Sequence, residues 1–276
     1  MSEQCDVVII GAGPSGAIAA GVLVKKGWRV IVVEKELFPR FSIGESLLPQ
    51  CMEFIEEAGM LDAVLSQADN LGFQFKNGAA FYRNGEHSHF DFNKKVTAGA
   101  STTFQVKRAS FDKLLADKAQ ELGADIRYQH EVIAVDFTQE KASVSVKAAD
   151  KTTLIETQFV LDASGFGRVL PKLLSLELPS TLSDKRSVFC HIEDNIDDGT
   201  EAKYYDRNKI LITVHPTQND IWFWLIPFAD GTASYGVVGD VSYFDANKTD
   251  EEVLDEFTQQ EPHLASLLCN AKKITS

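Results

Sequence analysis

The sequence VVIIGAGPSG, Val7–Gly16, joins a run of β-branched residues directly to a glycine-rich turn of the form GxGxxG. The next residues, Ala17–Lys26, are mostly small and suit a helix, and Arg29–Val33 is a second β-branched run. We expect a first strand over Cys5–Ile10. Strand, glycine turn, helix and strand in this order predict the βαβ unit of a dinucleotide-binding fold.

The three glycines of the turn have different physical tasks. Gly11 permits the tight turn, Gly13 lets the backbone approach a pyrophosphate, and Gly16 allows close packing of helix on strand. Pro14 and Ser15 begin the helix, where proline removes no needed N–H donor and the helix dipole favours an anion. We therefore expect these five residues to bind a dinucleotide.

A carboxylate follows the second strand at the spacing that this fold uses. Glu34 lies eighteen residues after Gly16, where its side chain can bind ribose hydroxyls, and Lys35 follows it. The negative charge would repel a 2′-phosphate, which disfavours NADP. The motif itself does not separate FAD from NAD.

The rest of the chain interrupts and then resumes the α/β pattern. A helix is expected from about Ser46 to Ala58, and another begins near Ser110. Further strands are expected at Ile126–Tyr128, Val132–Phe137, Ala142–Val146 and Phe159–Leu161, with mostly β structure over Phe73–Phe104 and Lys185–Val241 and a helical close over Asp250–Leu268.

This pattern predicts an α/β fold in which a Rossmann-like FAD/NAD(P)-binding domain is interleaved with a mixed β-sheet substrate domain. The nucleotide-binding domain is expected over residues 1–70 and 105–175, and the β-rich substrate-side domain over 71–104 and 176–276.

Composition excludes several classes of protein. The 27 Lys and Arg against 40 Asp and Glu give a formal charge of −13, which disfavours a nucleic-acid surface. The four cysteines are scattered without a CxxC pair, so neither a disulfide framework nor a zinc site is indicated. The sequence shows no signal peptide and no apolar run long enough for a membrane span, so we expect a cytoplasmic protein.

The histidines do not predict a metal or nucleophile site. His87 and His89 would share a strand face, but no third ligand lies near them in the sequence. The other histidines are isolated, and none forms a recognisable motif with serine and aspartate. We expect no metal site and no acyl-transfer chemistry.

Segments beyond the glycine turn carry a resemblance to the para-hydroxybenzoate-hydroxylase-like flavoproteins. These segments are Phe38-Pro39-Arg40 with Gly44-Glu45-Ser46-Leu47-Leu48-Pro49, Arg108 before Phe111-Asp112, and Asp162-Ala163-Ser164-Gly165. The resemblance implies FAD as the cofactor, with Arg108 near its phosphates or ribose, the strand around Val132 at the adenine, and the DASG turn closing the site. It adds Arg40, Ser46, Arg108, Val132, Asp162 and Gly165 to the expected cofactor-binding residues.

Three further segments resemble the flavin-dependent halogenases of the tryptophan-halogenase type. Ile43–Pro49 contains GESLLP, Gly72–Phe81 fits GFxxKxGAxF, and Trp222–Pro227 fits WxWxIP. The resemblance implies that reduced FAD, O2 and halide give hypohalous acid, and that Lys76 passes on or activates the halogen. Lys76 could act as a hydrogen-bond donor or, with a lowered pKa, as a haloamine. Without the resemblance, a solvated lysine beside an Asn77-Gly78 hairpin turn is the competing interpretation.

The resemblance also implies roles for residues around Lys76. Trp222 and Trp224 stand two apart on a strand and share a face, so with Pro227 they would form a wall on the substrate side. Glu45 could be catalytic, by polarising the flavin site or by orienting the passage between the flavin and Lys76. It could equally pair with Arg40.

The expected activity is halogenation of an electron-rich aromatic, free or carrier-bound, with an NADH-dependent flavin reductase as partner because no second βαβ unit is visible. The alternatives are an aromatic monooxygenase, a geranylgeranyl-reductase-like flavoprotein, and a non-catalytic FAD-binding remnant. Gly239-Asp240 resembles a third FAD motif but lacks its following residues. That motif and the FxPxSxG halide segment do not occur before Ser276, so we expect the C-terminal part of the family's fold to be absent.

Overall fold

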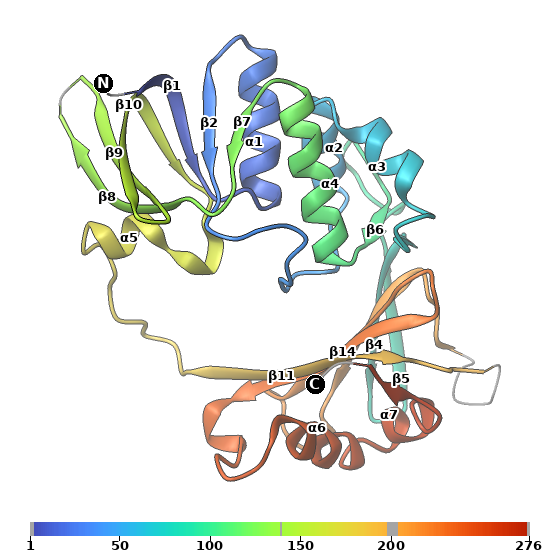
Figure 1. Ribbon diagram of the computed structural model, residues 1–276. Coiled ribbons are helices and arrows are strands. Elements are labelled where there is room, and N and C mark those ends of the chain that lie inside the picture. Colours follow the sequence, from blue (N-terminus) through green and yellow to red (C-terminus); the bar gives the residue numbers. More distant parts are fainter. Residues whose placement is uncertain (1–2, 139, 198–203, 275–276) are drawn as a thin grey trace. The chain divides into compact units, whose positions relative to one another are not determined.

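The computed structural model describes residues 3–138, 140–197 and 204–274, which form two compact units (Figure 1). Unit 1 comprises Met1–Ile43, Cys51–Leu71 and Arg108–Pro179, and unit 2 comprises Gly44–Gln50, Gly72–Lys107 and Ser180–Ser276. The division differs from the expected one chiefly at Gly44–Gln50, which groups with unit 2.

Unit 1 is built on a six-stranded sheet in the order β7-β2-β1-β10-β9-β8. β1 pairs in parallel with β2 and β10, β2 pairs in parallel with β7, and β8, β9 and β10 run antiparallel. The strands span β1 Glu3–Ile10, β2 Val30–Val33, β7 Asp125–Arg127, β8 Glu131–Phe137, β9 Ala142–Ala148 and β10 Lys151–Asp162. The continuous Val and Ile runs of β1 and β2 are buried, as strands in the middle of a covered parallel sheet require.

Two longer helices, α1 (Pro14–Lys25) and α4 (Arg108–Glu121), pack against each other in unit 1. The shorter helices are α2 (Gln50–Glu57), α3 (Leu61–Gln67) and α5 (Val169–Leu173), with a 3-10 turn at Gly165–Gly167. The helix expected from Ser46 begins only at Gln50, so its predicted start is wrong. Pro49 disfavours helical backbone at the residue before it, and Ser46 instead bridges to Gln105 in an extended conformation.

Unit 2 contains a seven-stranded sheet in the order β15-β11-β14-β13-β12-β4-β5 and a two-stranded ladder of β3 and β6. The strands span β3 Gln74–Lys76, β4 Gly78–Arg83, β5 Glu86–Asp91, β6 Thr103–Gln105, β11 Lys185–Glu193, β12 Lys209–Val214, β13 Trp222–Pro227, β14 Thr232–Asp240 and β15 Lys272–Lys273. Lys76 and Gly78 therefore lie in different sheets. Asn77 connects a strand of the two-stranded sheet to a strand of the seven-stranded sheet, which begins at Gly78. The prediction of a hairpin turn at Asn77-Gly78 is therefore wrong.

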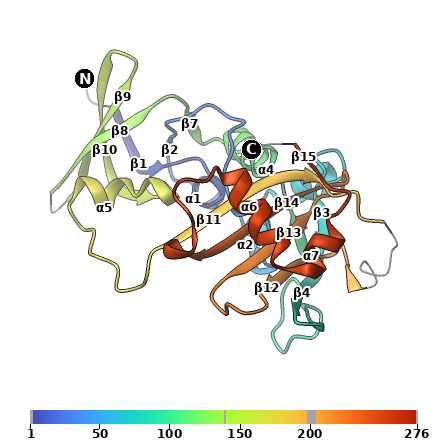
Figure 2. The same cartoon turned by 90° about the horizontal axis from the view of Figure 1, so that it is seen from below.

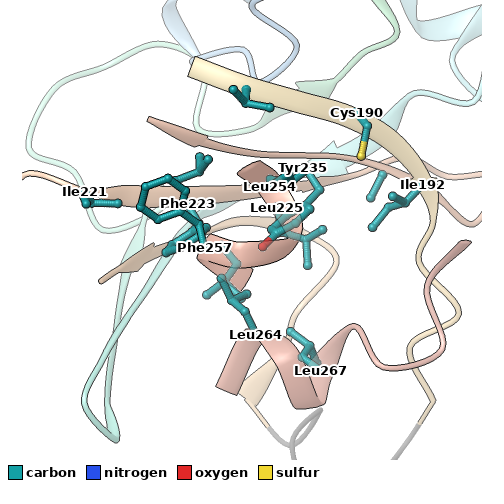
Figure 3. Close-up of a cluster of buried hydrophobic side chains, with 14 of the residues drawn as sticks. Cys190, Ile192, Ile221, Phe223, Leu225, Tyr235, Leu254, Phe257, Leu264 and Leu267 are labelled. Atoms are coloured by element: carbon teal, nitrogen blue, oxygen red, sulfur yellow. The ribbon is translucent and has the colours of Figure 1, made fainter. Parts of the chain in front are cut away.

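Helices α6 (Asp250–Gln259) and α7 (Pro262–Leu267) cover one face of the larger sheet of unit 2 (Figure 2). A capping box between Thr249 and Glu252 begins α6, and Pro262 begins α7. Phe223, Leu225 and Tyr235 point from the strands toward the helices and form the core with apolar residues of α6 and α7 (Figure 3). The other face of β13 is thereby left for Trp222 and Trp224.

Candidate functional site

The glycine turn of unit 1 has the close approaches expected of a phosphate-binding loop. Gly11 has a φ of +98°, and a Cβ on it would lie 2.8 Å from the carbonyl oxygen of Ala163. A Cβ on Gly16 would lie 1.9 Å from the carbonyl oxygen of Gly11. Since real Cβ atoms do not approach backbone this closely, only glycine fits at either position. α1 begins at Pro14 and Ser15 without a side-chain cap on Gly13, which leaves N–H groups for an anion.

Glu34 is 5% exposed and holds the loop from the end of β2. Its Oε2 accepts a hydrogen bond from the backbone N–H of Ala12 at 2.9 Å, and its Oε1 accepts one from Glu36 at 2.9 Å. The carbonyl of Glu34 accepts from the N–H of His130, just before β8. The exposed Lys35 pairs with Glu131 at 2.9 Å, which raises the pKa of Lys35.

Two arginines of unit 1 converge on one buried carboxylate beside the loop. Asp112 is fully buried; Arg108 reaches its Oδ1 with Nε at 2.7 Å and its Oδ2 with Nη2 at 3.0 Å. Arg40 Nη1 lies 3.5 Å from Oδ2 of Asp112, and Arg40 Nη2 lies 3.7 Å from Glu34 Oε2. A Cβ on Gly13 would be 3.5 Å from Arg40 Nη2. Two guanidinium groups and a helix N-terminus therefore surround the loop.

Asp112 was not expected as a site residue. Its signal is present in the sequence, because Arg108 and Asp112 stand four apart at the start of a helix, where their side chains meet. Arg108 also donates to the carbonyl of Ile43, the last residue of its segment of unit 1. The residues around the loop fit a bound pyrophosphate, since they supply close backbone approach and positive charge.

The DASG turn lies against the glycine turn. Asp162 Oδ1 accepts from the N–H of Ser164 at 2.9 Å, and its Oδ2 accepts from the N–H of Leu170 at 2.8 Å. The N–H of Ala163 donates to the carbonyl of Ile10, and Gly165 has a φ of +55°. Asp162 thus shapes its own turn and the start of α5.

Val132 lies in β8, the edge strand of this sheet. Its side chain is 7% exposed and packs in the apolar core of unit 1. A register shift separates Val132 from Ala134.

Lys76 is buried in unit 2, with 2% of its surface exposed. Its Nζ donates to the backbone carbonyl of Leu47 at 2.7 Å and lies 5.3 Å from the ring centre of Phe92. The interpretation of Lys76 as a solvated lysine in a hairpin is therefore wrong. A lysine that is almost fully buried is unusual enough to mark a functional position.

Glu45, one residue before Ser46, is 2% exposed and contacts a histidine from β11. Its Oε1 lies 2.8 Å from Nε2 of His191, and its Oε2 has no hydrogen-bond partner among the residues that the structure describes. The Glu45–Arg40 pairing considered from the sequence is wrong, because Arg40 pairs with Glu34 and Asp112. The view of His191 as isolated is also wrong, since its partner is 146 residues away.

The tryptophans of β13 share one face, opposite to the buried Phe223. The rings of Trp222 and Trp224 lie 6.1 Å apart, and Trp224 Nε1 donates to Ser234 Oγ at 3.1 Å. Gly236 stands opposite Trp224 on β14, where a Cβ would lie 2.4 Å from the indole. Pro227, at the end of the strand, accepts through its carbonyl from Gln105 Nε2 at 3.2 Å.

Two further features of the sequence can be located in the structure. Asp240 of the Gly239-Asp240 pair caps the turn after β14, and hydrogen bonds from Ser242 lower its pKa to about 2. Within residues 3–138, 140–197 and 204–274, no group of three His, Cys, Asp or Glu side chains could hold a metal ion. His87 instead stacks on Tyr204 at 4.2 Å. Nowhere in the described part of the chain is a helix long and apolar enough to cross a membrane.

Similar proteins are flavoproteins. The chain is 28% identical over 289 residues to the 1H-pyrrole-2-carbonyl-(peptidyl-carrier protein) chlorinase of Pseudomonas fluorescens, with 98% of this chain and 63% of that protein covered. The crystal structure of a flavoprotein/dehydrogenase from Cytophaga hutchinsonii is 40% identical, with a TM-score of 0.89 over 99% of this chain and 65% of that one. The myxobacterial chondrochloren halogenase CndH, an FAD-dependent halogenase, is 27% identical with a TM-score of 0.81, over 99% and 62%.

The chain spans less than two thirds of the length of the carrier-protein chlorinase and of both structures. The sequence profile of the family described as FAD binding domain matches residues 4–266. That range includes the glycine turn, the two arginines at Asp112 and the buried lysine. This chain belongs to the FAD-binding domain family.

Proposed function

We propose that this protein is a flavin-dependent halogenase that uses reduced FAD, O2 and halide to halogenate an electron-rich aromatic substrate. The observation that carries the proposal is the burial of Lys76, whose Nζ is fixed by the carbonyl of Leu47. The similarity to the carrier-protein chlorinase and to CndH supports the same activity.

The residues of unit 1 would hold FAD. Gly11, Gly13 and Gly16 would let the backbone approach the pyrophosphate, Arg40 and Arg108 would supply positive charge, and the Glu34 carboxylate would accept from the ribose hydroxyls. We assign supporting positions to Pro14, Ser15, Lys35, Val132, Asp162 and Gly165 of unit 1, and to Ser46 of unit 2. When bound and reduced, FAD would supply two of the four electrons that reduce O2, and the halide would supply the other two as it becomes hypohalous acid.

Lys76 would direct the oxidised halogen. Its ammonium can donate a hydrogen bond to hypohalous acid and polarise the oxygen–halogen bond, and burial strengthens that interaction because water does not compete. The hydrogen bond to Leu47 fixes the position of Nζ, so the halogen is presented at a defined place.

Glu45 would act as an acid or base near Lys76. It precedes Leu47 by two residues, and its unpartnered Oε2 can accept or hold a proton while His191 fixes Oε1. Trp222, Trp224 and Pro227 would form the wall that separates the organic substrate from the oxygen chemistry. The packing of Trp224 against Ser234 and Gly236 would make its part of that wall rigid.

The substrate class that we propose is taken from the same similar proteins. The relative from Pseudomonas fluorescens acts on a pyrrole bound to a carrier protein, so an electron-rich ring, free or tethered, is the substrate class that we propose. An NADH-dependent flavin reductase would supply reduced FAD.

A second candidate is a flavoprotein oxidoreductase without halogenation. It is favoured by the 40% identity to the Cytophaga hutchinsonii flavoprotein/dehydrogenase. An aromatic monooxygenase or a geranylgeranyl-reductase-like activity would belong to this class. The two candidates differ in whether bromide enters the product.

The test combines the protein with FAD, a flavin reductase, NADH, O2 and bromide, and offers an activated phenol, pyrrole or indole. We expect a brominated product from the wild type and none from Lys76→Ala, with FAD affinity unchanged. Lys94→Ala, an exposed lysine of the same unit, is the control. A hydroxylated or reduced product without bromine would favour the second candidate.

A further inference from the structure

Lys76 lies on a strand whose own pairing is too short to fix its position. β3 has three residues and belongs to a sheet of two strands, in which Lys76 pairs with Thr103 of β6. A two-stranded ladder of this kind is marginally stable by itself. Contacts from outside the ladder must therefore hold it. They converge on Arg207 and Asn208, the two residues before β12, which we name the 207–208 segment.

Asn208 binds the strand of Lys76 on both sides of the lysine. Its side-chain Oδ1 accepts a hydrogen bond from Gln74 Nε2 at 3.1 Å, and its backbone carbonyl accepts one from the N–H of Asn77 at 2.9 Å. The first contact lies two residues before Lys76 and the second lies one residue after it. Because the two hydrogen bonds flank the lysine, they restrain both the register and the tilt of β3.

Arg207 binds the second strand of the same ladder. Its backbone carbonyl accepts a hydrogen bond from Gln105 Nε2 at 3.3 Å, and the same amide donates to the carbonyl of Pro227 at 3.2 Å. The Gln105 side chain is fully buried, so water does not compete for its amide. The 207–208 segment therefore contacts both β3 and β6, and Gln105 connects the ladder to the end of β13.

A buried ion pair fixes the 207–208 segment. Arg207 Nη1 lies 2.5 Å from Oδ2 of Asp194, which is 4% exposed, and Arg207 Nη2 donates to the carbonyl of Phe228 at 2.6 Å. Such charge-assisted hydrogen bonds are stronger than those between neutral groups. Asp206 adds a turn, because its Oδ1 accepts from the N–H of Asn208 at 2.9 Å. The segment is thus anchored by residues outside the ladder that it contacts.

The turn does not explain why residue 208 is an asparagine. Asp206 accepts from the backbone N–H of residue 208, and nearly any side chain at that position would allow this bond. Asn208 does not have the positive φ that often selects asparagine. The contact that depends on the asparagine side chain is the one with Gln74, a residue of the Lys76 strand.

We infer that Asn208 and Arg207 are positioning residues that hold Lys76 at the carbonyl of Leu47. Nζ lies 2.7 Å from that carbonyl, and a small movement of β3 would displace it from the place where the reaction requires it. The two residues act through the ladder and not through contact with the substrate. Their effect on halogenation rests on the proposed function, whereas the restraint on β3 does not.

The test measures the accessibility of Lys76 in the purified full chain and needs no flavin turnover. Acetic anhydride acetylates lysine amines, and peptide mass spectrometry gives the initial rate at Lys76 relative to the exposed Lys94. Asn208→Ala removes the bond to Gln74. Loss of one hydrogen bond should raise the population of a loosened ladder, and with it the rate ratio, roughly fivefold. Asn208→Asp keeps an acceptor oxygen for Gln74 and should restore the wild-type ratio.

Arg207→Lys tests the anchor of the segment. A lysine cannot reach Asp194 and the carbonyl of Phe228 with the two arms of one planar group, so the segment should loosen. We expect the rate ratio at Lys76 to rise in this variant also.

Asn219→Ala is the matched control. Asn219 likewise accepts a hydrogen bond through its side-chain Oδ1, from Arg83 of β4, but it lies in the turn between β12 and β13. The substitution removes the same kind of contact from the same unit and leaves the 207–208 segment unchanged. We expect no change in the rate ratio at Lys76.

The full reaction with FAD, flavin reductase, NADH, O2 and bromide measures the consequence for turnover. Asn208→Ala should lower kcat, expressed per bound FAD, about fivefold, while KM for the aromatic substrate and FAD affinity stay unchanged. Asn208→Asp should restore kcat. A residue that merely supports the fold would change the amount of FAD-binding protein and not kcat per bound FAD.

An unchanged rate ratio in Asn208→Ala, an equal rise in Asn219→Ala, or no restoration by Asn208→Asp would overturn the inference. In a chain that brominates, an unchanged kcat in Asn208→Ala would overturn it as well. Failure of the proposed function has a different signature: the wild type would give no brominated product, while acetylation of Lys76 would still depend on Asn208.

Discussion

Arg108 donates two hydrogen bonds to the fully buried Asp112 one helical turn further along α4, with Nε 2.7 Å from Oδ1 and Nη2 3.0 Å from Oδ2. The same carboxylate faces Arg40 at 3.5 Å. One buried negative charge therefore orients two positive ones beside Gly13, and its removal should affect both.

Asp112→Asn should destabilise the fold and weaken FAD binding. Loss of the charge leaves two guanidinium groups without their shared partner, which costs about 3 kcal/mol in the free energy of unfolding. Urea unfolding measures the first effect, and flavin fluorescence titration should show FAD affinity at least tenfold lower. Asp117→Asn is the control, because Asp117 makes an exposed pair with Lys113 on the same helix. Unchanged FAD affinity in Asp112→Asn would contradict the role of this cluster.

Gly16→Ala should lower the free energy of unfolding far more than the same substitution at a glycine with free space around it. The new Cβ would lie 1.9 Å from the carbonyl oxygen of Gly11, so α1 or the turn must move. We expect a loss of about 2 kcal/mol or more and no measurable FAD binding. Gly85→Ala, where φ is +86° and no atom lies within 4 Å, should show only the backbone cost of about 1 kcal/mol. Similar losses of stability in Gly16→Ala and Gly85→Ala would contradict the close approach of Gly16 to the carbonyl of Gly11.

Glu45→Gln should lower halogenation without lowering FAD affinity. The substitution keeps the size of the side chain but removes the charge beside His191, while the glycine turn of unit 1 is untouched. We expect at least a tenfold loss of turnover and an altered pH profile of turnover. Glu193→Gln, two residues after His191 and exposed, is the control. A pH profile identical to that of wild type would restrict Glu45 to a structural role.

Cys190 should be the slow cysteine in alkylation. Burial raises the pKa of its thiol to about 11, so at pH 8 only about one molecule in a thousand carries the thiolate. The exposed Cys269 should react with iodoacetamide first, as peptide mass spectrometry can follow.

The same shift predicts a pH dependence of stability. Because the folded pKa lies above the unfolded one, the contribution of Cys190 is complete below about pH 8.5 and declines as the pH rises toward 11. Cys190→Ala should flatten this part of the stability curve. A curve of unchanged slope would contradict the assignment.

The parts of the site that could be predicted from the sequence are local. The glycine turn, Pro14 and the end of β2 lie within a few dozen residues, and hydrophobic periodicity with turn chemistry is enough to assign them. The burial of Lys76 could be expected only through the resemblance of its flanking residues, since Asn77-Gly78 suggested an exposed hairpin. β4 pairs with β12, more than a hundred residues later, and this long-range pairing decides the course of the chain at that point.

The Glu45–His191 contact lies beyond local reasoning for the same reason. The alternation of a strand indicates which face of the sheet a side chain occupies. It does not indicate which residue of a distant segment will contact that side chain. The sequence pattern predicted a helix from Ser46, but the backbone there is extended. The bridge to Gln105 and the following Pro49 both favour the extended conformation.

The division of the chain has a consequence for recombination. The polypeptide passes from one unit to the other after Ile43, Gln50, Leu71, Lys107 and Pro179, so neither unit is encoded by one uninterrupted stretch. A single crossover within residues 44–179 of two related genes would therefore mix parts of both units and separate residues that pack together. The unit with the glycine turn and the unit with Lys76 therefore cannot be inherited separately through one crossover. To exchange either unit by engineering, three segments must be replaced together.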